Sequence, residues 1–159
     1  MDVGIKCNEG TFKLRACGVI VRDGKILVDK ARNFNGFVFM GGHIELGENS
    51  RDGVVREIKE ELGFDMKIIK LLCVNENLYP LANGGVAHEV AYYYVLEPID
   101  KMPDEDFKHT EIDHGVEITH HFTWVKLEEA KNYNIRPNWV ANMILEGKED
   151  YCYLTDQTK

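Results

Sequence analysis

Cysteine and proline are scarce in this chain of 159 residues, which contains four of each. The cysteines are widely spaced and include no CxxC pair, so they predict neither a zinc site nor a disulfide framework. The sequence starts without the basic segment and apolar run of a secretory signal peptide, and no apolar run is long enough to cross a bilayer. We therefore expect a cytoplasmic protein with no membrane partner.

Positive charge is also in short supply. The chain has 19 Lys and Arg residues against 27 Asp and Glu residues, a formal net charge of −8. This balance disfavours a nucleic-acid surface, so we expect no nucleic-acid partner. Much of the acidic excess lies between Glu97 and Glu117, where eight acids stand against two lysines. We predict a polar loop there, with three interpretations left open: a lid, a contact in a homodimer, or a solvated surface.

The length fits one domain, residues 1–159, with one core. Hydrophobic periodicity and turn residues predict strands at residues 12–21, 25–28, 64–74, 86–96 and 120–126. Turns are predicted at Asp23-Gly24, at Tyr79-Pro80 and at Asn83-Gly84-Gly85, and a final helix near Pro137. Strands interspersed with helices predict an α/β fold in which a mixed sheet is covered on both faces.

A helix crowded with acids follows the glycine pair Gly41-Gly42. Asn49 or Ser50 can cap its start, and Gly63 can end it as a left-handed residue. On a helical wheel its three glutamates share one arc at the rim of the apolar face: Glu57, Glu60 and Glu61. The spacing i, i+3 and i+4 therefore brings these side chains together.

Like charges at this spacing cost a few tenths of a kcal/mol each unless a cation absorbs them. We expect no partner for the three acids in their own helix. Gly53 lies on the same arc, although glycine inside a helix costs about 1 kcal/mol relative to alanine. Its missing side chain leaves room for the preceding loop, an ion or a substrate. Oxygen ligands of this kind suit Mg²⁺ or Mn²⁺, and a solvated acidic face is the alternative.

The pattern resembles the signature of the Nudix hydrolase family, whose members are MutT-like: G-x5-E-x7-R-E-U-x-E-E-x-G-U, with U an apolar residue. The matching positions are Gly42, Glu48, Arg56, Glu57, Ile58, Glu60, Glu61, Gly63 and Phe64. The resemblance implies an α/β/α sandwich with a mixed sheet. It also implies a metal-dependent enzyme that hydrolyses the pyrophosphate bond of a nucleoside diphosphate linked to another group.

By the same resemblance, the metal ligands are Glu57, Glu60, Glu61 and the backbone carbonyl of Gly41. Arg56 is implied to orient the loop and the catalytic glutamate through hydrogen bonds. Glu48 is implied to support the loop or to accept a water near the metal.

A further ligand or base outside this stretch is not fixed by any motif. Glu117 and His121 are the candidates we name first. Glu97, Glu111 and His120 stay as alternatives, since strand alternation lets at most one of the two adjacent histidines face the site.

For substrate binding, Arg15 and Arg32 are candidates for a phosphate and Phe34 and Phe37 for a base, with surface or core roles as the alternatives. Pro80 weakly favours an ADP-ribose-like substrate, because a proline near this position is a tendency of ADP-ribose pyrophosphatases. Two alternatives remain: a (deoxy)nucleoside triphosphate pyrophosphohydrolase of the MutT type, and a non-catalytic nucleotide-sensing domain. All three imply a small nucleotide as the partner.

Overall fold

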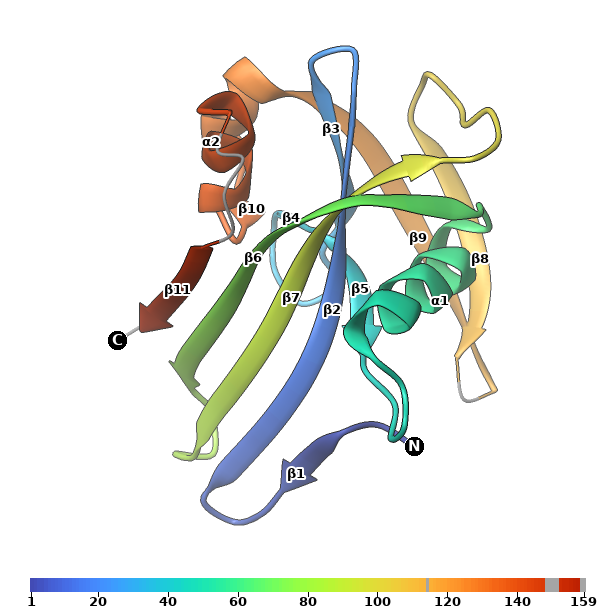
Figure 1. Ribbon diagram of the computed structural model, residues 1–159. Helices are drawn as coiled ribbons and strands as arrows, with labels where there is room; N and C mark the ends of the chain where they lie inside the picture. The colour runs from blue at the N-terminus through green and yellow to red at the C-terminus, as the bar shows by residue number, and fades with distance from the viewer. Residues whose placement is uncertain (114, 148–151, 158–159) are drawn as a thin grey trace.

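The computed structural model describes residues 1–113, 115–147 and 152–157. Its strands are β1 (Gly4–Lys6), β2 (Gly10–Arg22), β3 (Lys25–Lys30), β4 (Phe37–Val38), β5 (Met40–His43), β6 (Met66–Pro80), β7 (Val86–Pro98), β8 (Phe107–Asp113), β9 (Val116–Lys126), β10 (Ile135–Arg136) and β11 (Cys152–Gln157). The helices are α1 (Ser50–Leu62), a 3₁₀ helix η1 (Leu127–Asn132) and α2 (Trp139–Leu145) (Figure 1). No helix in the described part of the chain is long and apolar enough to cross a bilayer.

The strands form a mixed, strongly curled sheet in the order β10-β4-β3-β2-β7-β6-β11. β2 and β7 run parallel in its centre, whereas β6 pairs with β7 and β3 pairs with β2 in antiparallel fashion. β5 and β1 add to β2, and the β8–β9 hairpin joins through β9 to β3. The mixed sheet is therefore confirmed.

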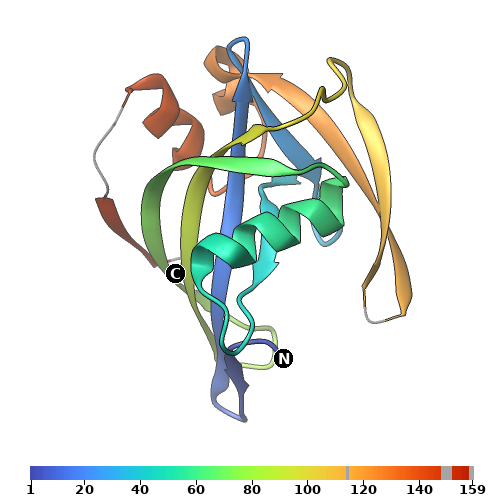
Figure 2. The ribbon, with the colours of Figure 1, turned by 45° about the vertical axis from the view of Figure 1, so that its right-hand side comes forward.

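Two apolar clusters cover the two faces of the sheet. Val54, Ile58 and Leu62 of α1 pack into one cluster. Residues 140, 141 and 143 of α2 pack into the other cluster, and Figure 2 shows α2 at the upper left, apart from α1. Because burial of one large apolar side chain contributes roughly 2 kcal/mol, each helix is fixed to its face by its apolar side. The helices thus lie on opposite faces, as the sequence predicted.

The ends of α1 follow the predicted caps. Asn49 is the N-cap, and its Oδ1 accepts the backbone N–H groups of Arg51 and Asp52, each at 3.0 Å. Gly63 ends the helix in the left-handed region at φ 81°, and its N–H bonds to the Lys59 carbonyl. Both predictions are confirmed because capping is decided by residues close in sequence.

One predicted turn is wrong. β6 continues through Tyr79 and Pro80, which pair with Ala87 and Val86 of β7, and the chain turns after them. Pro80 is tolerated because it is the last residue of the strand, where the missing N–H breaks no ladder bond inside the sheet.

The predicted loop from Glu97 to Glu117 is right only in part, because residues 99–106 lie outside the strands and most of the rest lie within them. Residues 107–113 form β8, and β9 begins at Val116, four residues before the predicted start at His120. β8 pairs with β9 alone among the described strands, so its charged residues lie on an edge strand, where they are well tolerated. The acids of this segment are therefore divided between the loop at residues 99–106 and exposed strands.

Candidate functional site

β5 delivers the glycine pair directly against α1. The Gly41 N–H donates to Glu61 Oε2 at 2.8 Å. A Cβ on Gly41 would collide with the backbone of Ala16 and Cys17, and its φ of 132° is a conformation that favours glycine. A Cβ on Gly42 would overlap the carboxylate of Glu57. The two glycines therefore form a cradle that lets backbone and carboxylates meet.

Arg56 is the centre of an ion-pair network. Its Nε and Nη2 donate to Glu48 Oε1 and Oε2 at 2.8 and 2.9 Å, a two-point pair. Its Nη1 donates to Glu57 at 2.8 Å and to Glu60 at 3.1 Å. Its Nη2 also donates to the carbonyl of His43 at 3.0 Å. The expectation that the glutamates have no partner in their own helix is wrong, because Arg56 forms ion pairs with Glu57 and Glu60.

Glu48 packs where Gly53 lacks a side chain. A Cβ on Gly53 would lie 3.0 Å from Glu48 Oε2. That oxygen also accepts the Glu45 N–H at 3.0 Å. The predicted room beside Gly53 is thus filled by the preceding loop. The hydrogen bond from Arg56 holds the pKa of Glu48 below its usual range.

The three glutamates do not converge on one point in this conformation. Glu57 and Glu60 turn to Arg56, while Glu61 turns to Gly41. Within the part of the chain that the structure describes, one group of acidic or His side chains is close enough to hold an ion. It consists of Glu61, Glu111 and His120, with ligand atoms within 4.8 Å of one another. The β8–β9 hairpin thus brings a carboxylate and an imidazole to α1.

His120 is held on both sides. Its Nδ1 lies 2.7 Å from Asp29 Oδ2, and its Nε2 lies 3.0 Å from Glu111 Oε1. The ring stacks on Phe122 with 5.7 Å between centroids, and the residue is 3% exposed. Asp29 was missed by the sequence analysis, because the pairing of β3 with β9 that brings it to His120 joins residues 91 positions apart.

The first candidates outside the helix do not reach this group. Glu117 is exposed and pairs with Ile112, so it points to the face of the hairpin opposite Glu111. His121 is likewise on the outer face, since it follows His120. The structure instead brings in two of the alternatives, Glu111 and His120. The prediction that the two adjacent histidines point to opposite faces of the strand is confirmed, but the sequence did not show which of them faces inward.

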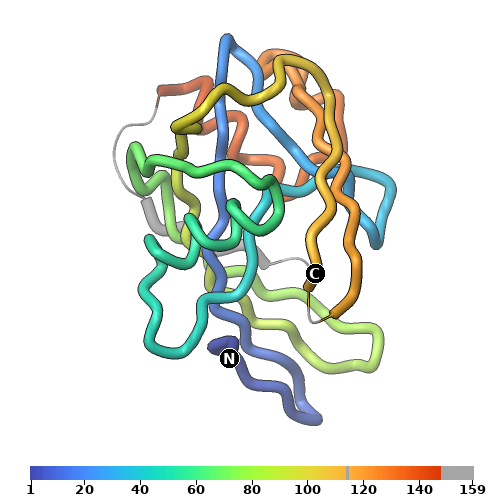
Figure 3. The backbone as a smooth tube through the Cα atoms, turned by 90° about the vertical axis from the view of Figure 1, so that its right-hand side faces the viewer, coloured from blue at the N-terminus to red at the C-terminus, as the bar shows by residue number. Residues whose placement is uncertain are grey.

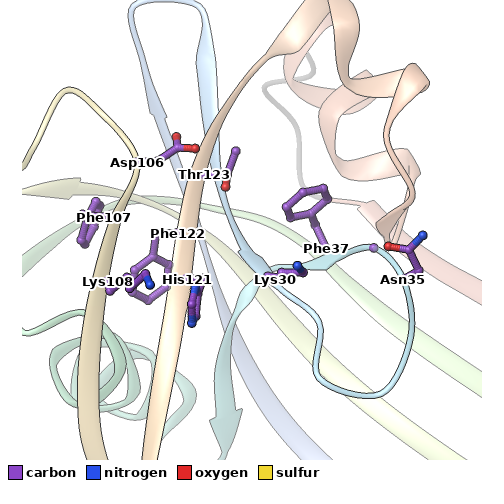
Figure 4. A pocket seen from close by; sticks show the side chains of 10 residues that line it. Lys30, Asn35, Phe37, Asp106, Phe107, Lys108, His121, Phe122 and Thr123 are labelled. Carbon is purple, nitrogen blue, oxygen red and sulfur yellow. The ribbon is translucent and has the colours of Figure 1, made fainter.

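A pocket of about 400 Å³ lies on that outer face, between the loop before β4 and the β8–β9 hairpin. Figure 4 shows Phe37, Lys30, Lys108 and His121 around it. Two of the sequence candidates, Phe37 and His121, therefore share a hollow with two ammonium groups. Such a lining suits an aromatic or anionic group.

Arg32 and Phe34 are placed elsewhere. Neither belongs to the described lining of this pocket. The Phe34 ring instead lies under the guanidinium of Arg136, 4.3 Å from its centroid, in a cation–π contact. The structure therefore gives neither residue a position in this hollow.

Burial dominates the electrostatics of the group at α1. It raises the pKa of Glu61 to about 8, against the opposing charge of His120. It also raises the pKa of Glu57, although Arg56 works in the other direction. Burial would lower the pKa of His120, but hydrogen bonds to Asp29 and Glu111 raise it to about 9. Near pH 7 the metal-free group therefore retains protons.

These shifts predict that the metal-free protein loses stability as pH rises. Glu61 binds its proton more tightly when folded, so its contribution falls from about pH 4.5 to 8. The contribution of His120 is complete below about pH 6.5 and is lost as pH rises through about 9. We expect melting temperatures in chelator to fall by several degrees from pH 5 to 9, since 1 kcal/mol corresponds to roughly 2–4 °C.

Glu61→Gln is the control for this measurement. Glutamine keeps an acceptor for the Gly41 N–H but cannot titrate, so the fall should begin later, above about pH 6.5. A wild-type melting temperature that is constant or rises over this range would contradict the assignment.

The donors at this site fit a hard divalent cation. Glu57, Glu60 and Glu61 offer carboxylate oxygens, and the Gly41 carbonyl offers a further oxygen. The glycine cradle at Gly42 already accommodates one of these carboxylates against the backbone. All-oxygen sites of this kind suit Mg²⁺ and Mn²⁺.

Comparison with known proteins gave one family and several similar structures. The family model described as "NUDIX domain" matches residues 12–143. An ADP-ribose pyrophosphatase of Methanocaldococcus jannaschii is 48% identical over 85 residues, which cover 52% of this chain and 48% of that protein. The chain thus matches about half the length of this curated relative.

Two solved structures extend the comparison. A MutT NUDIX hydrolase from Burkholderia pseudomallei is 29% identical, with a TM-score of 0.56 over 74% of this chain and 84% of its own. A MutT protein from Bacillus halodurans has a TM-score of 0.70 over 92% of this chain and 90% of its own, at 18% identity. The second likeness concerns the fold alone, and it agrees with the curled mixed sheet and its helices.

Proposed function

Because the chain belongs to the NUDIX family, we propose that it is a hydrolase that cleaves the pyrophosphate bond of a nucleoside diphosphate joined to a second group. An ADP-ribose-like compound is the favoured substrate. The observation that carries this proposal is the ordered glycine–glutamate–arginine network, in which Arg56 fixes Glu48 and Glu57 while Gly41 fixes Glu61. The chain keeps all three glutamates, which favours an enzyme over a domain that only senses a nucleotide.

The proposed chemistry is attack of water on one phosphorus of the diphosphate. When bound, Mg²⁺ or Mn²⁺ neutralises the anionic diphosphate and lowers the pKa of water. Glu57, Glu60 and Glu61, with the Gly41 carbonyl, are the residues proposed to hold it. Arg56 keeps Glu57 in place, and Glu48 keeps Arg56 in place.

We assign the ligand or base outside the helix to Glu111. Its carboxylate lies near Glu61 and is oriented by His120, which Asp29 holds from the other side. A carboxylate within reach of the attacking water can take its proton. The chain Asp29–His120–Glu111 then positions that base from three different strands, β3, β9 and β8.

Two observations bear on the substrate. The relative from Methanocaldococcus jannaschii is called an ADP-ribose pyrophosphatase, which supports the favoured compound. The similar structure from Burkholderia pseudomallei is called a MutT NUDIX hydrolase, which keeps a (deoxy)nucleoside triphosphate as the second candidate. The pocket around Phe37 and His121 is our candidate for the group beyond the diphosphate.

The substrate is tested by comparing kcat/KM for ADP-ribose, nucleotide sugars, diadenosine polyphosphates and nucleoside triphosphates at one Mg²⁺ concentration. We expect ADP-ribose to lead and to give AMP and ribose 5-phosphate. A triphosphate that leads by about tenfold, or about 1.4 kcal/mol of transition-state preference, would replace ADP-ribose as the substrate. The products would then be a monophosphate and pyrophosphate.

A further inference from the structure

Arg15 of β2 reaches the same carbonyl that we assign to the metal. Its Nη2 donates to the Gly41 oxygen at 2.6 Å. Its Nη1 lies 3.5 Å from Glu89 Oε2 on β7. The Arg15 side chain keeps 29% of its exposure, whereas that of Glu89 keeps 11%. The guanidinium is therefore held between the Gly41 carbonyl and Glu89, while part of the side chain remains exposed.

A guanidinium and a divalent cation cannot both occupy this carbonyl without strong repulsion between like charges at contact distance. Arginine does not lose its proton in proteins, so Arg15 cannot relieve the repulsion by becoming neutral. The repulsion can instead be relieved if the guanidinium moves off the Gly41 oxygen and stays close to Glu89. A planar fork of N–H donors set free beside a metal site matches the paired oxygens of a phosphate group.

A second observation shows that Arg15 stands on a face built for polar contacts. Strand register places Thr11, Arg15, Asn75, Asn77 and Glu89 on the sheet face opposite α1. Among the described residues, three buried side-chain oxygens have no hydrogen-bond partner, and all three belong to this face: Thr11 Oγ1, Asn75 Oδ1 and Asn77 Oδ1. Asn75 is 3% exposed. Buried side-chain acceptors without donors are rare, so this face is able to accept hydrogen bonds from a bound group.

We propose that Arg15 is a substrate-positioning residue that changes partners, holding the Gly41 carbonyl in the metal-free protein and turning to a diphosphate oxygen when a divalent cation takes that carbonyl. This inference rests on the proposed function. It implies that Arg15 lowers the affinity for the metal when no substrate is bound and raises the affinity for the substrate when the metal is bound. A residue that merely supported the strand would not act in these two opposite directions.

The test is Arg15→Gln, studied by calorimetry with Mn²⁺ alone and then with a non-hydrolysable methylene analogue of ADP-ribose at saturating Mn²⁺. We expect Mn²⁺ to bind roughly threefold tighter or more to the nucleotide-free variant, and the analogue to bind roughly tenfold weaker, about 1.4 kcal/mol. Arg15→Lys keeps the charge but loses the fork. It should bind Mn²⁺ like wild type and the analogue more weakly.

Glu89 needs a matched variant, because a buried carboxylate left without its cation destabilises the fold. Arg15→Gln with Glu89→Gln removes both charges, and it should show the same two opposite shifts. Arg51→Gln removes one charge from an exposed position of α1 and should change neither affinity.

Parallel losses of Mn²⁺ and analogue affinity in both Arg15→Gln proteins would show a structural role and overturn the inference, as would unchanged affinities. Wild-type protein that binds no Mn²⁺ would overturn the proposed function itself, and the inference with it.

Discussion

Turnover should fall to background when divalent cations are removed. Glu57, Glu60 and Glu61 supply the negative charge at α1, and a diphosphate brings more, so substrate and site repel each other without a cation between them. The expected loss is at least roughly 10³-fold, the order reached when a major electrostatic stabiliser of a transition state is lost. The measurement is the hydrolysis rate in excess chelator and after Mg²⁺ or Mn²⁺ is added back.

The control separates metal loss from unfolding. The metal-free protein should keep its fold, because both apolar clusters are independent of the site carboxylates. A melting transition should therefore remain in chelator, and activity should return when metal is restored. Undiminished hydrolysis in excess chelator would show that the carboxylates do not serve a metal.

Glu61→Gln should lower activity without lowering stability. The carboxylate is buried and its pKa is raised to about 8, so ionising it for the metal works against the fold. Glutamine keeps an acceptor toward Gly41 without the charge. We expect turnover to fall by roughly 10³-fold or more, while the melting temperature at pH 8 without metal equals or exceeds that of wild type.

Glu60→Gln should have a smaller effect than Glu61→Gln, because Glu60 is half exposed and shares Arg56 with Glu57. It should weaken Mn²⁺ binding and turnover with little change in melting temperature. Glu128→Gln, an exposed acid of η1, should change neither quantity. If Glu61→Gln kept wild-type rates at limiting Mg²⁺, the assignment of this glutamate as a ligand would be refuted.

Local structure around the helix could be predicted from the sequence because its causes are local. Asn49 and Gly63 cap α1 through bonds to residues within four positions. Gly53 leaves the space that Glu48, five residues earlier in the chain, fills. The pairing of Arg56 with the glutamates was underestimated, because a wheel shows directions but not how far a long guanidinium reaches.

The other half of the site could not be predicted, because it depends on pairing between distant strands. Glu111 and His120 remained two of several candidates, and Asp29 was not considered. The register of β9 against β3 brings Asp29 opposite Phe122, and the register against β8 decides that Glu111 faces inward. Neither register leaves a signal in the local pattern, and the acids of this segment suggested a loop.

The β8–β9 hairpin limits which insertions and deletions this protein can accept. Inside β8, only a change of an even number of residues keeps the same side chains facing inward. Residues 116–121 of β9, between the tip of the hairpin and Phe122, pair with β8 and not with β3 (Figure 3). A single residue inserted or deleted inside β8 would turn Ile112 or Thr110 inward in place of Glu111, because successive side chains alternate between faces. Changes of two residues keep the faces as they are, although they move the side chains along the strand. Tolerated changes of length are therefore expected near the tip, around Gly115, or in pairs.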